Sequence, residues 1–198
     1  MFTGIIETTG NIESIVHENQ TIVITIASNI SNELKIDQSV AHNGICLTVI
    51  ALGENTHTVC AVSETMLKTA IGQWKLHDII NLERCMKLND RLDGHIVQGH
   101  VDTPATCVYK SDTNNNWVYR FEIPTTFNHL MIEKGSICVN GTSLTCFNVT
   151  KNTFEVAIIP YTYYHTSIRL IQEGDAVNIE FDIIGKYFAR MQSLQQAS

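Results

Sequence analysis

Long apolar runs and clusters of basic residues are missing from this sequence. No apolar stretch approaches the roughly 18 residues that a membrane-spanning helix needs. Lys and Arg number 13 against 20 Asp and Glu, which gives a net charge of −7. Both features argue against nucleic acid or a membrane surface as the partner. The start, MFTGIIETTG, carries neither the basic nor the apolar segment of a secretion signal. We therefore expect a cytoplasmic protein.

Paired cysteines and glycine-rich phosphate loops are also absent. The six cysteines include no C-x-x-C pair of the kind that structural zinc uses, and they are typical of buried thiols. Neither G-x-G-x-x-G nor G-x-x-x-x-G-K occurs in the chain. His95 and His100 could suggest a metal site, but side chains five apart on one strand point to opposite faces. We predict no metal and no cofactor.

What the chain does contain is an internal repeat. HNGICLTV at 42–49 returns as VNGTSLTC at 139–146, an offset of 97 residues. The register persists, because HDIINLE lines up with GDAVNIE, and FTGIIE lines up with VQGHVD after a slip of two residues. Such a period is the signature of a duplicated module. We predict two modules, at 1–90 and 97–186.

Each module is typical of a small β-barrel. TIVITIA alternates as a half-buried strand does, and Asn-Gly between two β-prone runs is a strong hairpin signal. About six strands in about 90 residues suit a closed barrel, which leaves no exposed strand edge. Short helical turns are expected at SETMLKTAI and IPTTFNHLMI. The predicted fold is all-β, with two tandem, similar six-stranded Greek-key-type barrels plus a C-terminal helix.

The tail is predicted to form an amphipathic helix. Its apolar residues recur at helical spacing and share one face. They are Ile184, Tyr187, Phe188, Met191 and Leu194. We expect 187–198 to be an oligomerisation helix that packs against a neighbouring subunit.

Polar side chains follow both Asn-Gly turns at equal positions. Cys46 and Thr48 are two apart on a predicted strand, so they project from one face, and Ser143 and Thr145 do the same in the second module. The duplicated faces suggest two similar binding surfaces. Ordinary alternation along a surface strand would also explain them, and the pattern alone leaves both interpretations open.

Segments in order along nearly the whole chain resemble riboflavin synthase. They are MFTGIIE, SVAHNGICLTV, NLER, LDGHIVQGHVD, KGSICVNGTSLT and GDAVNIEFDIIGKY. The resemblance implies two barrels and a helix that assembles a homotrimer. It also implies dismutation of two 6,7-dimethyl-8-ribityllumazine molecules, the last step of riboflavin biosynthesis, at a site between two subunits and without metal or cofactor. Lumazine synthase is a further partner that the resemblance allows.

The resemblance also assigns residues to two lumazine pockets. An N-terminal ligand-binding strand and the first pocket are matched by Thr3, Gly4, Ile5, Cys46, Leu47, Thr48, Ser63, Glu64 and Thr65. The start of the second barrel and the second pocket are matched by Gly99, His100, Val101, Lys134, Ser143, Leu144, Thr145, Ile159, Pro160, Tyr161 and Thr162. His100 is the candidate for proton transfer, since histidine titrates near neutral pH. Either Cys46 or Ser143 could add to C7 of one lumazine or position a water there.

The chain departs from the family pattern at three places. Asn140 stands where many relatives have Asp, which removes a carboxylate that either takes part in the reaction or only shapes the turn. PYTYYHTSIR places three tyrosines near the second pocket, and Ile45 stands where some relatives have a second Cys.

Three other functions agree less well with the sequence. Antenna proteins of the same family bind lumazines or flavins without turnover, but they lose parts of the motifs that hold His100, Ser143 and Thr145 here. A flavin-reductase barrel expects an R-x-Y-[ST] signature, which the sequence lacks. A purely structural β-protein would not explain the duplicated polar faces.

Overall fold

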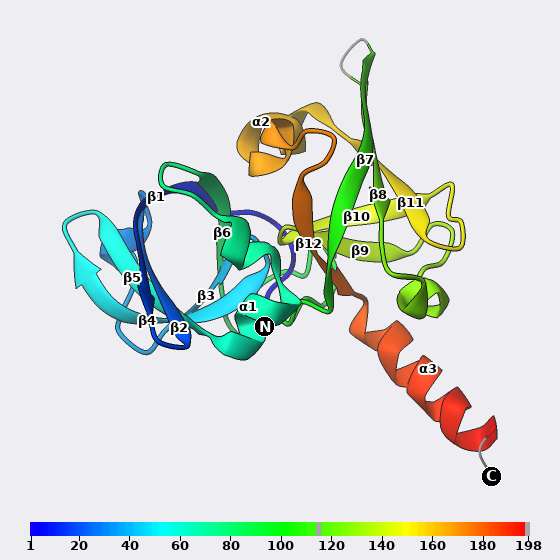
Figure 1. Cartoon of the computed structure of the whole chain (residues 1–198), viewed down its shortest axis with the longest axis horizontal. Helices are drawn as coiled ribbons and strands as arrows, with labels where there is room; N and C mark the ends of the chain where they lie inside the picture. Colours follow the sequence, from blue (N-terminus) through cyan, green and yellow to red (C-terminus); the bar gives the residue numbers. More distant parts are fainter. Residues whose placement is uncertain (114–115, 197–198) are drawn as a thin grey trace.

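Two closed barrels make up most of the molecule in the computed structural model, which describes residues 1–113 and 116–196 (Figure 1). The first contains β1 (Thr8–Glu18), β2 (Thr21–Ala27), β3 (Ser39–His42), β4 (Ile45–Gly53), β5 (Thr56–Val62) and β6 (Ile79–Arg84). The second contains β7 (Thr103–Thr113), β8 (Asn116–Glu122), β9 (Ser136–Val139), β10 (Thr142–Phe147), β11 (Thr153–Ile158) and β12 (Ala176–Phe181). All described pairings are antiparallel, and both barrels close in the same cyclic order, β1-β2-β5-β4-β3-β6 in the first. In each barrel three hairpin-connected strands are flanked by a returning fourth, as in a Greek key. The predicted fold class is confirmed.

Short helical turns connect the strands where the sequence predicts them. SETMLKTAI forms α1 (Ser63–Lys68) and the start of η2 (Ala70–Gln73), and IPTTFNHLMI contains η3 (Thr125–Leu130). The remaining turns are η1 (Ser31–Glu33), α2 (Pro160–His165) and η4 (Ser167–Leu170). Because α1 follows β5 and α2 follows β11, the two barrels carry matching helices at matching ends.

Both Asn-Gly pairs form the predicted tight turns. The φ angles are 44° and 79° at Asn43 and Gly44, and 45° and 82° at Asn140 and Gly141. Positive φ at both central positions defines a type I′ hairpin. The two turns also meet, because a Cβ on Gly44 would lie 2.7 Å from the backbone nitrogen of Gly141. The repeated glycines therefore serve the turn and a close contact between the barrels.

Two buried asparagines tie the barrels together at this contact. The Asn81 side-chain amide donates to the Asn140 carbonyl at 2.8 Å, and the Asn178 amide donates to the Asn43 carbonyl at 2.9 Å. Asn81 and Asn178 occupy equivalent positions of the repeat and are each 1% exposed. A satisfied buried hydrogen bond contributes about 1 kcal/mol, whereas an orphaned one costs more. The bonds thus favour one relative orientation of the barrels.

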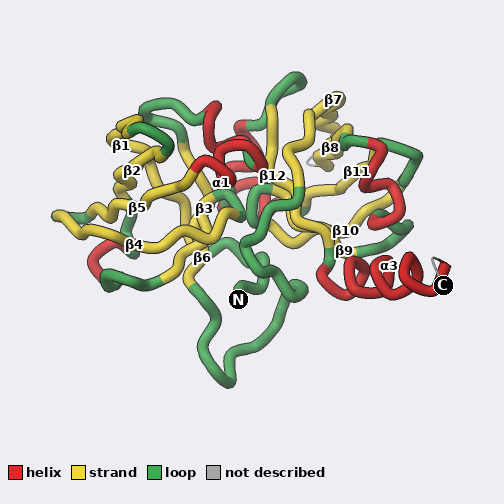
Figure 2. Tube along the Cα trace, turned by 60° about the horizontal axis from the view of Figure 1, so that its bottom comes forward, coloured by secondary structure: helices red, strands yellow, loops and turns green. Residues whose placement is uncertain are grey.

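The segments that precede each barrel cross to the other barrel. Phe2 forms an isolated antiparallel bridge with Val97, and the N-terminus lies between the barrels (Figures 1 and 2). The Gly4 carbonyl accepts from the Ser143 amide at 2.7 Å, and the Gly99 carbonyl accepts from the Cys46 amide at 2.9 Å. The modules predicted at 1–90 and 97–186 are therefore intertwined rather than separate, since each lends its first residues to a strand of its neighbour.

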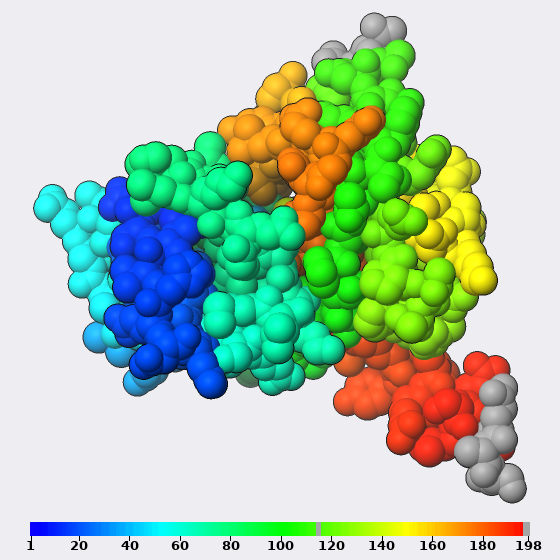
Figure 3. Space-filling view, viewed as in Figure 1, coloured from blue at the N-terminus to red at the C-terminus, as the bar shows by residue number. Residues whose placement is uncertain are grey.

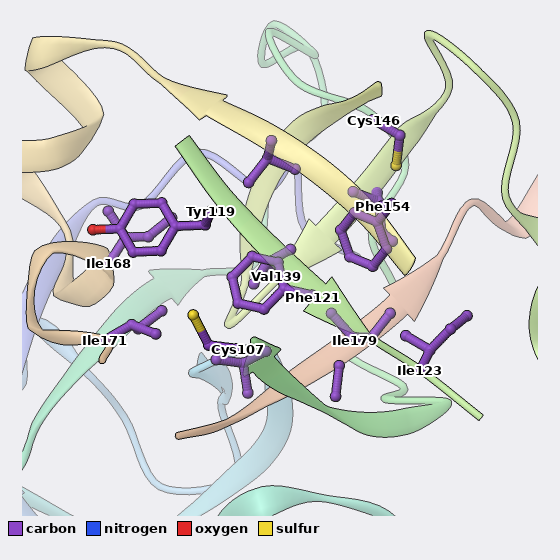
Figure 4. Close-up of a cluster of buried hydrophobic side chains, with 14 of the residues drawn as sticks. Cys107, Tyr119, Phe121, Ile123, Val139, Cys146, Phe154, Ile168, Ile171 and Ile179 are labelled. Atoms are coloured by element: carbon purple, nitrogen blue, oxygen red, sulfur yellow. The ribbon is translucent and has the colours of Figure 1, made fainter. Parts of the chain in front are cut away.

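The two cores use different side chains at equivalent positions. On β2 the inward residues are Ile22, Ile24 and Ile26, and on β8 they are Trp117, Tyr119 and Phe121. Figure 4 shows Tyr119 and Phe121 among the side chains that fill the second barrel. The duplicated backbone therefore accommodates an aliphatic core in one copy and an aromatic core in the other.

A histidine pair lies inside the first barrel. The Nε2 atoms of His42 and His57 are 2.9 Å apart, His42 Nδ1 is 3.0 Å from the Val40 carbonyl, and His57 Nδ1 is 2.8 Å from Ser31 Oγ. The carbonyl requires a proton on His42 Nδ1, so His42 Nε2 accepts from His57, and His57 Nδ1 accepts from Ser31. All four ring nitrogens are satisfied with both rings neutral. Burial, together with the neighbouring ring, lowers the pKa of His42 to about 3, and burial lowers that of His57 to about 4.

Acid is expected to destabilise the first barrel through this pair. In the unfolded chain both rings protonate near the ordinary pKa of 6.5, whereas the folded chain excludes those protons until the pH approaches the lowered values. Stability is therefore fully present above pH 6.5 and is lost as the pH falls, by about 1.4 kcal/mol per pH unit for each histidine. We expect urea midpoints between pH 7.5 and 5 to fall steeply. The double variant His42→Val and His57→Phe places at these positions the residues that the second barrel has at the equivalent ones, Val139 and Phe154. It should make the slope clearly shallower; equal slopes in the variant and the unchanged protein would contradict the prediction.

A longer helix, α3 (Ile183–Gln196), leaves the second barrel and projects from the body (Figures 1 and 3). It begins before the predicted boundary at residue 187, and residues 197–198 lie outside the described part of the chain. Lys186 Nζ fixes its first turn by an ion pair with Asp102 at 2.9 Å. Its apolar face is more than half exposed at every position, at Ile184, Tyr187, Phe188, Met191 and Leu194. Among helices of the described residues, none is long and apolar enough to span a bilayer.

Candidate functional site

The first polar face lies on the outside of the first barrel. Leu47 points into the core, so Cys46 and Thr48 on either side of it face outward, as the strand pattern predicts. On β3, Ala41 pairs with Cys46 and Ser39 pairs with Thr48. Burial raises the pKa of the Cys46 thiol, and a hydrogen bond with the Ser39 hydroxyl only partly opposes that effect. The thiol is therefore protonated at neutral pH.

Two further segments border this face. Since β4 runs antiparallel to β5, its first residues lie beside the end of β5, where residues 63–65 begin α1. On the same strand, the amide of Cys46 donates to the carbonyl of Gly99, and Val101 packs against the first core. The first face thus combines 63–65 and 99–101 with the outward residues of β4.

The second polar face repeats this arrangement on the second barrel. Ser143 and Thr145 point outward from β10, and the Ser143 amide donates to the carbonyl of Gly4. Antiparallel pairing of β10 with β11 places residues 159–162, at the start of α2, near the first residues of β10. Lys134 lies at the other end of β10, where its backbone amide donates to Cys146 and its ammonium lies over the Phe147 ring at 5.6 Å from the centroid.

The crossing of the segments changes how the predicted residues are grouped. Sequence order puts 3–5 with the first module and 99–101 with the second, but the structure places each stretch beside the opposite barrel. The three predicted catalytic residues are divided accordingly. His100 follows Gly99, whose carbonyl accepts from Cys46 on the first face, and Ser143 belongs to the second. Among the described residues no group of His, Cys, Asp or Glu has the arrangement of a metal site.

Two buried glutamates, which the sequence motifs did not predict, hold the crossing segments. Glu83 accepts three hydrogen bonds from Thr3 and Gly4, and Glu180 accepts three from the backbone amides of 98–100, all between 2.7 and 3.1 Å. They are 5% and 2% exposed, and burial raises the pKa of both carboxyls, while the hydrogen bonds act in the opposite direction. The sequence pattern that could have revealed them is an acidic residue at equivalent positions of the repeat, each within an otherwise apolar strand.

His95, which the sequence analysis considered only as a metal ligand and rejected, contacts the second face. His95 Nδ1 lies 2.6 Å from Ser143 Oγ, and its Nε2 is buried without a hydrogen-bond partner. Burial lowers the pKa of His95, against a smaller opposing effect of Asp182. A neutral imidazole can accept the hydroxyl proton of Ser143. At Gly94 a Cβ would clash with the Thr3 carbonyl, so glycine is what allows His95 to approach.

Asn140 lies in the contact between the two barrels rather than on either polar face. Its Oδ1 accepts a hydrogen bond from the backbone N–H of Asn178 at 2.8 Å. In the other barrel, Asn43 Oδ1 accepts one from the backbone N–H of Asn81 at the same distance. This hydrogen bond gives the Asn140 side chain a structural partner and favours the second of the two roles left open by the sequence, in which it shapes the turn.

Substitution of Asn140 by Asp is accordingly expected to have little effect. A carboxylate can accept the same hydrogen bond from Asn178, so we expect the free energy of unfolding to change by about 1 kcal/mol or less. Turnover should stay within about threefold of the unchanged protein, a difference of less than 1 kcal/mol in the barrier. Thermal melts and steady-state kinetics check both values. A large rise in turnover would instead show that the missing charge limits the reaction.

Comparison with known proteins first identifies the class to which these paired barrels belong. A family model described as a lumazine binding domain matches twice, at residues 3–85 and 98–182. In fold, the chain is similar to LumP crystallised with riboflavin, with a TM-score of 0.86 at 18% identity, over 91% of this chain and 99% of that one. LumP complexed with 6,7-dimethyl-8-(1′-D-ribityl)lumazine gives a TM-score of 0.83 at 19% identity, over 91% and 98%.

Curated relatives narrow the class further. The chain is 39% identical to riboflavin synthase of Bacillus subtilis over 96% of its own length and 89% of that protein. It is 38% identical to riboflavin synthase of Actinobacillus pleuropneumoniae, over 94% and 87%. The chain belongs to the riboflavin synthase family.

Proposed function

We propose that the protein is a riboflavin synthase, a transferase that converts two molecules of 6,7-dimethyl-8-ribityllumazine into riboflavin and 5-amino-6-(ribitylamino)pyrimidinedione. The observation that carries the proposal is the duplicated outward face, Cys46 and Thr48 on one barrel and Ser143 and Thr145 on the other. Two molecules of one substrate require two similar binding faces. Holding both molecules together makes their reaction effectively unimolecular, which can supply several kcal/mol of the barrier.

The two molecules must also be treated differently, since one gives up a four-carbon unit and the other receives it. The Ser143–His95 pair supports such a difference, because Cys46 on the first face is a protonated thiol instead. In the proposed reaction Ser143, with its proton accepted by His95, adds to C7 of one lumazine or orients a water there. His100 on the first face transfers the proton of the 7-methyl group of the other.

We also propose that the chain acts as a homotrimer assembled through α3. The exposed apolar face of this helix supports assembly, since monomers rarely leave such contiguous surface uncovered. The first face of one subunit would then meet the second face of the next and bring His100 and Ser143 to one site.

Association with lumazine synthase and a cytoplasmic location rest on the sequence alone and stay predictions. Co-sedimentation with lumazine synthase tests the first, and cell fractionation tests the second.

Incubation of the metal-stripped protein with 6,7-dimethyl-8-ribityllumazine alone tests the function. One riboflavin formed for every two lumazines consumed, with no added cofactor, is the expected result. Tight binding without product would favour an antenna protein. Neither binding nor product would overturn the proposal, and product that appears only after a metal is restored would overturn its metal-free form.

A further inference from the structure

A cavity lies between the two barrels, beside the contact of the two Asn-Gly turns. Its volume is about 660 Å³, which is within the range of small-molecule sites, and such sites often lie between domains. From the first barrel the cavity is lined by η2 and the start of β6, and from the second by η4 and the start of β12. None of its described lining residues belongs to the two assigned lumazine pockets. The cavity is therefore a separate candidate site.

Two buried asparagine side chains, one from each Asn-Gly turn, line this cavity. Asn43 is 7% exposed and Asn140 is 9% exposed. Oδ1 of each side chain accepts a hydrogen bond from a strand backbone N–H at 2.8 Å, which fixes the orientation of the amide. Neither Nδ2 group donates a hydrogen bond to any described residue. Because an unpaired buried amide is costly, the two nitrogens mark where acceptor atoms of a ligand fit.

Two carboxylates at equivalent positions of the repeat, Asp78 and Asp175, also line the cavity. Oδ2 of each accepts a hydrogen bond from the backbone N–H three residues earlier at 2.8 Å, so both side chains are held in place. Oδ1 of each makes no hydrogen bond with the described residues and is available to a donor. Lys75 is the other charged residue of the described lining, which leaves one net negative charge there. Anions such as phosphate are therefore disfavoured.

Trp74 gives the cavity an aromatic wall. Its side chain packs against the first core and is half-buried, and the remaining part of the indole faces the cavity. A flat apolar surface of this kind packs against C–H groups, whereas amides and carboxylates bind oxygen atoms and O–H groups. A hydroxyl group suits both, since it accepts from an amide and donates to a carboxylate. We propose that the cavity binds a neutral polyhydroxy compound, either a free sugar or a sugar alcohol.

Titration of the nitrogen-15-labelled protein with ribitol and with sorbitol tests this site by nuclear magnetic resonance. The side-chain amide signals of Asn43 and Asn140 should shift saturably with at least one of the two, at millimolar concentrations, since so small a ligand has little surface to bury. Asn140→Asp keeps the acceptor for Asn178 but replaces the free donor by an oxygen. It should weaken binding by about tenfold or more, because a donor to the ligand becomes a charged acceptor.

Asp175→Asn and Glu173→Gln are a matched pair, since each removes one negative charge and keeps an oxygen for its backbone partner, but Glu173 does not line the cavity. We expect Asp175→Asn to weaken sugar-alcohol binding by about threefold to tenfold, as loss of one charged acceptor does, and Glu173→Gln to leave it unchanged. This pair keeps the test valid if Asn140→Asp fails to fold, which thermal melts show.

No saturable shift with either sugar alcohol would overturn the inference. Binding of putrescine or of inorganic phosphate in their place would overturn the ligand class, and binding that Asn140→Asp and Asp175→Asn leave equally strong would assign the site elsewhere. Turnover of 6,7-dimethyl-8-ribityllumazine, measured on the same samples, separates this inference from the proposed function. A protein that binds the sugar alcohol in the cavity but neither binds nor converts lumazine would overturn the proposed function alone.

Discussion

Replacement of Ser143 by alanine is expected to lower kcat by about 10²- to 10⁴-fold, the range that a positioned proton-transfer group supplies. The physical reason is the 2.6 Å contact between Ser143 Oγ and His95 Nδ1, which makes this hydroxyl the one with a base in place. Alanine removes the group that adds to C7 or orients the water there, and it leaves the backbone hydrogen bond to Gly4 intact. Lumazine binding should therefore change far less than turnover.

Cys46→Ser is the matched comparison on the first face. Burial keeps the Cys46 thiol protonated, so a hydroxyl of similar shape should cost less than about tenfold in kcat, equivalent to roughly 1.4 kcal/mol of barrier. His95→Gln should lower kcat as Ser143→Ala does, and the double variant should add little, since both act through one proton transfer. Steady-state kinetics with lumazine titrations measure these effects. A larger loss in Cys46→Ser than in Ser143→Ala would assign the nucleophile to the first face.

Periodicity was sufficient to predict the barrels but not the path between them. Strand alternation and Asn-Gly turns are local signals, and they placed Cys46 beside Thr48 and Ser143 beside Thr145 correctly on shared faces. The segments around Gly4 and Gly99 form no regular strand, and only the isolated bridge at Phe2 and Val97 is regular. Nothing in local spacing says which barrel such a segment contacts. That choice is seen only in hydrogen bonds to residues far away in the sequence, from Ser143 to Gly4 and from Cys46 to Gly99.

His95 shows how a correct rule can be applied to the wrong structure. Residues five apart point to opposite faces only on one regular strand, whereas 95–100 contains only the bridge at Val97. The glycine at 94 was the signal that this stretch approaches other backbone closely. The buried glutamates were more accessible to prediction. Glu83 and Glu180 repeat in register within apolar strands, where a carboxylate requires hydrogen-bond donors.

Substitution of Phe188 by Glu on α3 is expected to disrupt the trimer and, with it, the activity. Phe188 is 69% exposed in the single chain, and covering a phenylalanine contributes about 1.5–3 kcal/mol. Three charges introduced at one interface should weaken assembly by at least about 100-fold. Since the proposed site combines faces of two subunits, kcat per chain should fall with the trimer. It should recover as the protein concentration rises, because assembly follows mass action.

Ser193→Glu provides the matched control, because it adds the same charge to an exposed position on the opposite side of α3. Sedimentation at several concentrations, combined with activity in the same samples, separates assembly from folding. Both variants should melt at similar temperatures if the barrels fold independently of the helix. If Phe188→Glu sediments and turns over as Ser193→Glu does, α3 does not assemble the protein. A monomer with full activity would also contradict the proposed site between two subunits. One chain would then have to hold both lumazines on its own two faces, with His100 and Ser143 acting within the same molecule.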